Sequence, residues 1–255
     1  MNYGLWMSAA GMSSQVHRQS VIANNLANAS TNAFKPDFTM TRERPSAVEE
    51  RGNVPSSQQL LERLGGGVLV EPTWTDFAQG GLQESGNPLD LALNGPGFFL
   101  VNDGEGAQRL TRNGVFERNA AGMLVNHDGF EVLDRNHRMI RLPDNDNSLI
   151  SVSADGSLQD SSGTVVARLA IVDAKSSDLT KEGEGLYAFH GDQSPAFAGD
   201  MTTLKQGWTE SSGTDPVIEM ARLIDTSRTI EANARLISIH DQIMNMTVNR
   251  LGATS

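Results

Sequence analysis

The sequence contains no cysteine among its 255 residues. This absence excludes disulfide bridges, thiolate metal sites and a cysteine nucleophile. Basic residues are also few. The sequence has 20 Lys and Arg and 31 Asp and Glu, which gives a formal net charge of −11. Binding to a nucleic-acid backbone requires clustered Lys and Arg, so the charge balance argues against a nucleic-acid partner.

The sequence also has no long hydrophobic run. No segment approaches the roughly 18 apolar residues of a membrane-spanning helix, so we predict no membrane insertion. The first 18 residues have neither a basic start nor an unbroken apolar centre, and they are therefore not typical of a cleaved secretion signal. We expect a soluble protein, or one that is exported by a route that uses no cleaved signal.

Apolar residues recur every three or four positions near the N-terminus and predict a helix over residues 5–26. The polar run 30–32 ends this helix, since its side chains compete for backbone hydrogen bonds. The stripe consists of Leu5, Ala9, Met12, Val16, Gln19, Ala23 and Leu26, with Gln19 as its polar interruption. So short a stripe would not form a coil alone in water. The helix either packs on its own domain or becomes ordered when neighbouring subunits cover it.

A longer helical pattern occupies the C-terminus. Asp215 is placed to cap this helix, Pro216 stands at its first position, and Gly252 follows its end. Its stripe consists of Met220, Leu223, Ser227, Ile230, Ala234, Ile237, Asp241, Met244, Val248 and Leu251. A small β domain cannot cover a stripe of this length. We therefore expect the two helices to pair and to leave an apolar strip for other subunits.

The middle of the chain has a different pattern, in which short β-like runs alternate with Gly and Asn turns about every ten residues. The runs are residues 89–93, 97–101, 114–118, 122–126, 131–134, 139–142, 149–153, 164–173 and 186–189. This spacing predicts an antiparallel all-β sandwich or barrel-like domain. A parallel βαβ arrangement is excluded because no helical pattern separates the runs.

These patterns together predict an α+β fold, in which a central antiparallel all-β domain carries terminal helices that pair into a coiled-coil assembly segment. We assign residues 1–35 and 215–255 to a terminal helical assembly domain and residues 76–195 to the central β domain. Residues 36–75 and 196–214 form extended connections between them. Within the first connection, residues 56–65 suggest one short helix, with a surface linker as the alternative.

No group of residues has the pattern of a catalytic, cofactor-binding or metal-binding site. The histidines never fall at metal-ligand spacing. Residues 144–149 begin like a calcium-binding loop, but Leu149 stands where glycine is required. We therefore expect no enzyme activity and no cofactor, and we predict an assembly interface instead. Its residues are Leu5, Met12, Val16, Leu26, Met220, Leu223, Ile230, Ile237, Met244, Val248 and Leu251.

Several segments resemble the flagellar hook–basal-body rod family of axial proteins, and the resemblance covers essentially the whole chain. GLWMSAAGMSSQVHRQSVIANNLANASTNAFK is similar to the family's N-terminal signature helix. GNPLDLALNGPGFFLV and RLTRNGVFERNAAGMLVNHDGFEVL are similar to the start of its central β domain. The run from QGWTESSGTDPVIEM to MNMTVNRLG resembles its C-terminal signature. Trp208, Gly213 and Thr214 depart from the hydrophobic residue and Asn-Val that the family usually has before the last helix.

The resemblance implies a structural subunit of the bacterial flagellar basal-body rod, which polymerises through its terminal helices into the helical drive shaft across the periplasm. The implied partners are copies of itself, other rod and hook proteins, and the flagellar type III export apparatus, which reads no cleaved signal. In the family both termini are disordered in the monomer. The length favours a rod subunit over a hook subunit, and we prefer the proximal rod to the distal rod. The alternatives are a cell-envelope adaptor that binds through its β domain and a peptidoglycan hydrolase.

Overall fold

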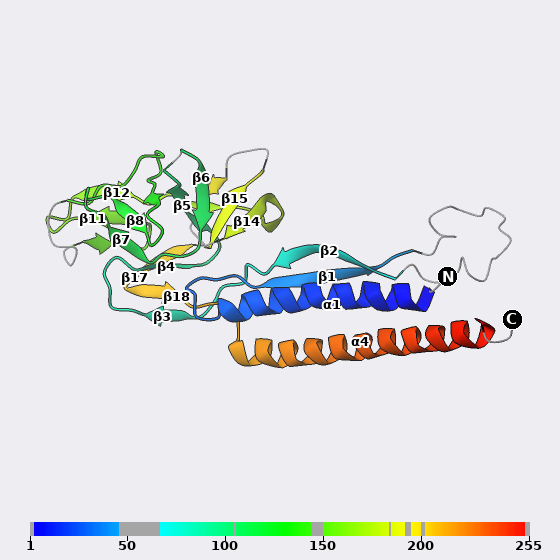
Figure 1. Cartoon of the computed structure of the whole chain (residues 1–255). Coiled ribbons are helices and arrows are strands. Elements are labelled where there is room, and N and C mark those ends of the chain that lie inside the picture. Colours follow the sequence, from blue (N-terminus) through cyan, green and yellow to red (C-terminus); the bar gives the residue numbers. More distant parts are fainter. Residues whose placement is uncertain are drawn as a thin grey trace. The chain divides into compact units, whose positions relative to one another are not determined.

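The computed structural model describes residues 3–45, 67–104, 106–143, 150–183, 185–191, 195–199 and 202–252, and Figure 1 shows the course of the chain. The chain forms two compact units. We call the first the helical unit, which consists of Met1–Ala27, Asp37–Asp76 and Asp215–Ser255. The second is the β unit, which consists of Asn28–Pro36 and Phe77–Thr214.

The helical unit contains both predicted helices, α1 (Tyr3–Ala27) and α4 (Pro216–Gly252). The predicted cap of α4 is confirmed, because Asp215 Oδ1 accepts hydrogen bonds from the N–H groups of Val217 at 2.9 Å and Ile218 at 3.3 Å. The two helices pack against each other in antiparallel orientation, so that the start of α1 and the end of α4 lie at the same end of the unit (Figure 1).

Two strands complete the helical unit. β1 (Asp37–Glu43) and β2 (Val68–Thr75) form an antiparallel hairpin that contacts α1 (Figure 1). Asn25 holds the start of this hairpin, because its Nδ2 donates to the carbonyl of Asp37 at 2.8 Å and its Oδ1 accepts from the Asp37 N–H at 3.0 Å. The sequence indicated an extended connection here, and the short helix predicted over residues 56–65 lies outside the described residues.

The β unit has a central sheet in the order β14-β15-β6-β5-β9-β8-β7, to which β13 and β16 are joined. A three-stranded sheet, β10-β11-β12, and the pairs β17-β4 and β18-β3 complete it. The strands are β3 (Leu82–Glu84), β4 (Leu91–Asn94), β5 (Phe98–Asn102), β6 (Gln108–Thr111), β7 (Phe116–Arg118), β8 (Leu124–Asn126), β9 (Glu131–Val132), β10 (Ser151–Val152), β11 (Ser157–Gln159), β12 (Val165–Arg168), β13 (Ile171–Asp173), β14 (Leu179–Gly183), β15 (Leu186–Phe189), β16 (Ala196–Phe197), β17 (Thr203–Gln206) and β18 (Trp208–Glu210).

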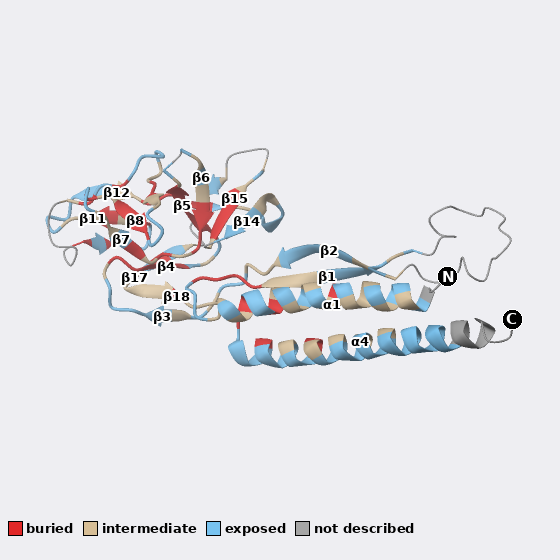
Figure 2. Cartoon of the chain, viewed as in Figure 1, coloured by how far each residue is buried: buried red, intermediate tan, exposed pale blue. Residues whose placement is uncertain are grey.

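All strand pairs among the described residues are antiparallel, which confirms the predicted class of the central domain. The core of the β unit is apolar (red in Figure 2) and is built around edge-to-face aromatic contacts such as Phe99–Phe116, whose ring centroids lie 5.1 Å apart. Gly114 lies so close to β4 that a Cβ atom there would be 1.7 Å from the Leu91 carbonyl oxygen. Only glycine fits at this position.

Candidate assembly surface

The side of α4 that faces α1 is only partly apolar. Glu219 and Thr226 are buried there, whereas Leu223, Ile230 and Ile237 are half-buried. These residues follow one another at spacings of three, four and seven, which places them on one side of the helix. The contact between the helices therefore uses alternating polar and apolar residues, and it covers the centre of the stripe that the sequence predicted.

α4 also exposes large apolar residues. Their exposed fractions range from 42% to 68%, and they are Val217, Ile218, Met220, Ile224, Leu236, Ile239, Ile243, Met244 and Met246. Leu236, Ile239, Ile243 and Met246 are spaced by three and four and form one continuous strip, which we call the outer strip of α4. Figure 2 shows this part of the helix as mostly exposed. A contiguous apolar strip on a protein surface is typical of an interaction site.

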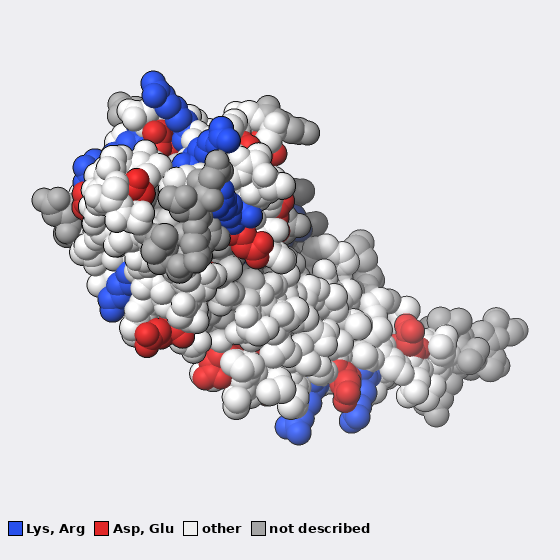
Figure 3. Space-filling view, turned by 90° about the vertical axis from the view of Figure 1, so that its left-hand side faces the viewer, with Lys and Arg blue, Asp and Glu red and all other residues white. Residues whose placement is uncertain are grey.

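Charged residues separate the apolar residues at the two ends of α4. Asp225, Arg228, Glu231 and Arg235 are exposed between Ile224 and Leu236. On the face that Figure 3 shows, basic side chains are interspersed with acidic ones. Such mixed charges fix the orientation of a partner more than they add affinity.

The predicted interface residues do not all lie on one surface. Val16, Met220 and Met244 are exposed, whereas Leu5, Met12, Leu26, Leu223, Ile230 and Ile237 are half-buried. Val248 and Leu251 belong to the last turns of α4, whose side chains lie outside the described part of the chain. Sequence reasoning missed the outer strip, although its residues repeat with the same spacing as the predicted stripe.

Exposed apolar side chains also occur on the other two elements of the helical unit. On α1 they are Trp6, Met7 and Val16, and on the hairpin they are Met40, Val68, Val70 and Trp74. The guanidinium of Arg44 lies 5.9 Å from the centroid of the Trp6 ring, and the ring of Phe38 lies 5.9 Å from that of Trp74. Apolar groups for a partner are therefore available on α1 and the hairpin as well as on α4.

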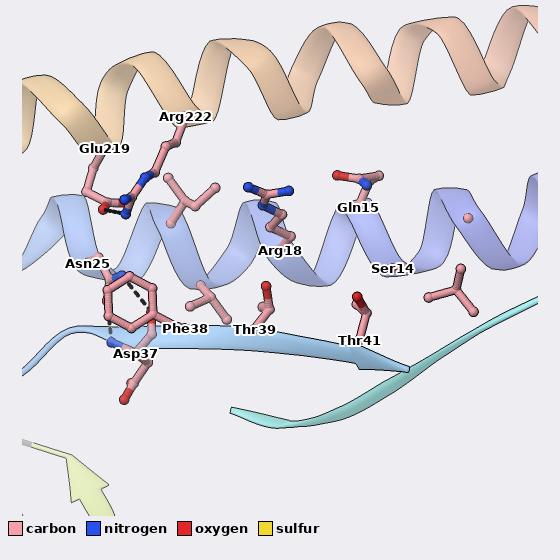
Figure 4. Close-up of a pocket in the computed structure, with 14 residues that line it drawn as sticks. Ser14, Gln15, Arg18, Asn25, Asp37, Phe38, Thr39, Thr41, Glu219 and Arg222 are labelled. Atoms are coloured by element: carbon pink, nitrogen blue, oxygen red, sulfur yellow. Dashed lines mark hydrogen bonds and ion pairs between the residues drawn. The ribbon is translucent and has the colours of Figure 1, made fainter. Parts of the chain in front are cut away.

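A polar cleft of about 420 Å³ opens between α1, β1 and the first turns of α4 (Figure 4). Glu219 and Arg222 point into it from α4, and their closest atoms, Oε1 of Glu219 and Nη1 of Arg222, lie 2.6 Å apart. The Arg222 guanidinium lies 5.7 Å from the centroid of the Phe38 ring. Glu219 is only 4% exposed, and its Oε2 has no hydrogen-bond partner among the described residues. This oxygen is therefore a buried acceptor without a donor, which is costly.

The described residues contain no group of three or more His, Asp or Glu side chains that could hold a metal ion. Residues 144–149, which begin like a calcium-binding loop, lie outside them. Within the same part of the chain, no helix is long and apolar enough to cross a membrane.

Comparison with known proteins places three family models on the chain. Residues 7–35 match "Flagella basal body rod protein", residues 92–160 match "Flagellar hook protein FlgE/F/G D1 domain", and residues 205–251 match "Flagellar basal body rod FlgEFG protein C-terminal". The first and third matches contain most of α1 and α4, and the second lies in the β unit.

The chain is similar to curated proteins over nearly its whole length. It is 31% identical to the flagellar basal-body rod protein FlgG of Buchnera aphidicola subsp. Baizongia pistaciae, over 94% of this chain and 96% of that protein. It is 32% identical to the flagellar basal-body rod protein FlgF of Caulobacter vibrioides, over 91% of each. It is 29% identical to FlgG of Bacillus subtilis, over 96% of this chain and 97% of that protein.

Proposed function

Since the chain belongs to the flagellar hook–basal-body rod protein family, as a structural subunit of the rod, we propose that it polymerises through its helical unit, with the outer strip of α4 as the central contact. The observation that carries this proposal is the strip itself, which remains uncovered after α1 has packed on the other side of the helix. The partners we propose are further copies of the chain and other rod and hook proteins.

The energy available from the strip is sufficient for an interface. Complete burial of an Ile, Leu or Met side chain contributes roughly 1.5–3 kcal/mol, so covering the exposed half of one such residue contributes on the order of 1 kcal/mol. Burial of the outer strip and Ile224 together contributes several kcal/mol. This gain offsets part of the free energy that a subunit loses when its translation and rotation are restricted on binding. A helix that packs into neighbouring subunits by a contact that does not close a ring builds a helical filament.

The cleft at Glu219 supports the same proposal. The Glu219 carboxylate oxygen without a donor gains a hydrogen bond if the side chain turns toward an N–H or O–H group that a neighbouring subunit places in the cleft. We propose that this contact adds specificity, while the apolar strip supplies most of the affinity.

The finer features that the resemblance implies form part of this proposal. The α1–α4 pair would act as the coiled-coil segment of the filament, and the predicted residues on its inner side would hold the pair together. Export by the flagellar type III apparatus without a cleaved signal and a rod that spans the periplasm would follow from this function. The preference for the proximal rod stays a prediction, since relatives named FlgG and FlgF match the chain with similar identity.

The test is a charge placed on the outer strip. Ile239→Asp should abolish polymerisation, because the aspartate would be desolvated in the interface, while the melting temperature of the single chain should hardly change at this half-exposed position. Ser238→Asp adds the same charge at an exposed polar neighbour and should leave assembly intact. Filament formation is measured by sedimentation and electron microscopy. Normal filaments from Ile239→Asp would contradict the proposal.

A further inference from the structure

The chain passes between its two units four times, after residues 27, 36, 76 and 214. Within the β unit, three segments adjoin these crossings: residues 28–36, residues 77–80 and residues 210–214. The first leads from α1 to the hairpin, the second follows the hairpin, and the third precedes α4. The third segment contains Glu210, whose buried carboxylate accepts hydrogen bonds from the other two segments.

Both carboxylate oxygens of Glu210 are occupied. Oε1 accepts hydrogen bonds from Lys35 Nζ at 2.6 Å and from the Gly80 N–H at 2.8 Å. Oε2 accepts one from Arg112 Nε at 2.9 Å. The side chains of Lys35 and Glu210 are each only 1% exposed, and that of Arg112 is 5% exposed. Two cations and a backbone amide from three separate parts of the β unit therefore converge on one acid.

The backbone of these segments is joined as well. The N–H of Ala33 donates to the carbonyl of Glu210 at 2.7 Å, and the N–H of Gly213 donates to the carbonyl of Phe34 at 2.9 Å. Lys35 Nζ makes a second hydrogen bond, to the carbonyl of Ala78 at 2.7 Å. Residues 28–36 are thus held against both of the other crossing segments.

The network also reaches the central sheet. The guanidinium of Arg112 donates to the carbonyl groups of Gly95 and Gly97, which precede the central strand β5. Lys181 of β14 donates to the carbonyl of Lys35 at 2.8 Å. The network therefore links the crossing segments to the central sheet through charged hydrogen bonds.

Two glycines allow the segments to approach this closely. A Cβ atom on Gly80 would lie 2.3 Å from the Ser211 carbonyl oxygen, and one on Gly213 would lie 3.0 Å from Cδ of Pro36. Gly81, the neighbour of Gly80, has no atom within 4 Å of such a Cβ. The close approach is specific to the positions where the crossing segments meet.

We infer that Glu210 is a mechanical junction, which holds together the three segments of the β unit from which the chain continues into the helices and the hairpin. A buried polar network whose members are hydrogen-bonded is rigid, but loss of the acid leaves two cations buried without compensation. The junction should therefore stay rigid under load rather than yield gradually. In a rod subunit, such a positioning residue keeps the three crossing segments of the β unit together when the chain is under load. The inference concerns transmission of load and does not depend on which surface assembles.

The first test is amide hydrogen exchange on the full chain. In Glu210→Gln the amides of Ala33, Gly80 and Gly213 should exchange at least tenfold faster, while those of Leu133 and Ala170 in the core keep their protection. Glu182→Gln breaks a more exposed ion pair with Arg109 and serves as the control. The inference would be overturned if exchange became equally faster at the core amides and at the amides of the crossing segments. It would also be overturned if exchange at the crossing segments did not change.

The second variant leaves every charge in place. Gly80→Ala should speed up hydrogen exchange at the amides of the crossing segments, because the added methyl group forces these segments apart. Gly81→Ala should leave the exchange rates unchanged. In cells, both junction variants should form rods in normal number but lose motility in viscous medium more steeply than the two controls. Motility that falls in parallel with the number of rods would mean that the network serves folding alone, and would overturn the inference.

Discussion

Gln19 Nε2 donates a 3.1 Å hydrogen bond to Ser227 Oγ, so the polar residues that interrupt the two apolar stripes meet between α1 and α4. Gly4 and Gly11 lie against His240 and Asn233 in the same antiparallel alignment. A polar pair in a helix contact fixes the alignment, because a shifted alignment leaves both groups without a partner. The interruptions therefore specify how the helices pair.

We expect the pair to contribute coupling energy. In a double-mutant cycle with Gln19→Ala and Ser227→Ala, each single change should lower the free energy of unfolding by about 0.5–1.5 kcal/mol, and the double variant should lose less than their sum. Urea denaturation followed by circular dichroism measures all four proteins. Strict additivity would show that the hydrogen bond does not stabilise the pair.

The stability of the β unit should fall in acid because of Glu210. Burial alone would raise the pKa of this carboxyl group, but the charges of Arg112 and Lys35 and the hydrogen bonds from Lys35 and Gly80 outweigh it and lower the pKa from 4.5. Because the pKa of Glu210 is lower in the folded protein than in the unfolded chain, the ionised carboxylate stabilises the fold. This stabilisation is fully present above about pH 4.5 and is lost as the pH falls through the pKa of the folded state.

Comparison with Glu210→Gln isolates this contribution. The pKa values of Asp155 and Asp160 are also lowered, chiefly by hydrogen bonds from the Ser157 and Ser162 side chains, so other carboxyl groups contribute to the acid response. We expect the urea midpoint of the natural protein to decrease more steeply below pH 4.5 than that of the variant. Parallel curves for the two proteins would refute the assignment to Glu210.

Gly114→Ala should be among the most destabilising single substitutions in the β unit. The added methyl group would overlap the carbonyl oxygen of Leu91 and press against the Phe99 ring, so β4 would have to move. We expect a loss of about 3 kcal/mol or more, measured by thermal unfolding. Gly199→Ala is the matched control, since it meets no neighbour and should change the melting temperature little.

Glu219→Gln tests the cleft between α1, β1 and α4. The change keeps the shape of the side chain but turns one carboxylate oxygen into a donor, so an N–H or O–H group from a neighbouring subunit would no longer be accepted at that atom. We expect Glu219→Gln to raise the critical concentration for polymerisation. The control variant Glu231→Gln, at an exposed position of α4, should leave that concentration unchanged. Equal critical concentrations for both variants would count against a role for the cleft in assembly.

Much of the fold could be predicted because its signals are local. The cap at Asp215 and the three-four spacing of apolar residues determined where α4 begins and that it is a long helix. Turn residues between short apolar runs indicated antiparallel strands. Strands with charged residues, such as β6 and β14, were missed, because strand formation depends on partners that the local sequence does not contain.

The candidate assembly surface could be predicted only in part. The repeat on α4 fits two sides of the helix, with Leu223 and Ile230 on one side and Leu236 and Ile239 on the other. Spacing alone determined that an apolar stripe exists. The packing of α1 decided which side is covered and which remains for a neighbour, because burial depends on what lies opposite.

The sequence by itself thus determined the two helices, the antiparallel β class and the absence of cysteine chemistry, since each depends on residue type and on neighbours within a few positions. The tertiary structure alone decided the side of α4 left exposed and the convergence of Lys35 and Arg112 on Glu210. Those two cations are 175 and 98 residues away from Glu210 in the chain. Contacts at such separations follow from how the whole chain packs, and no local pattern encodes them.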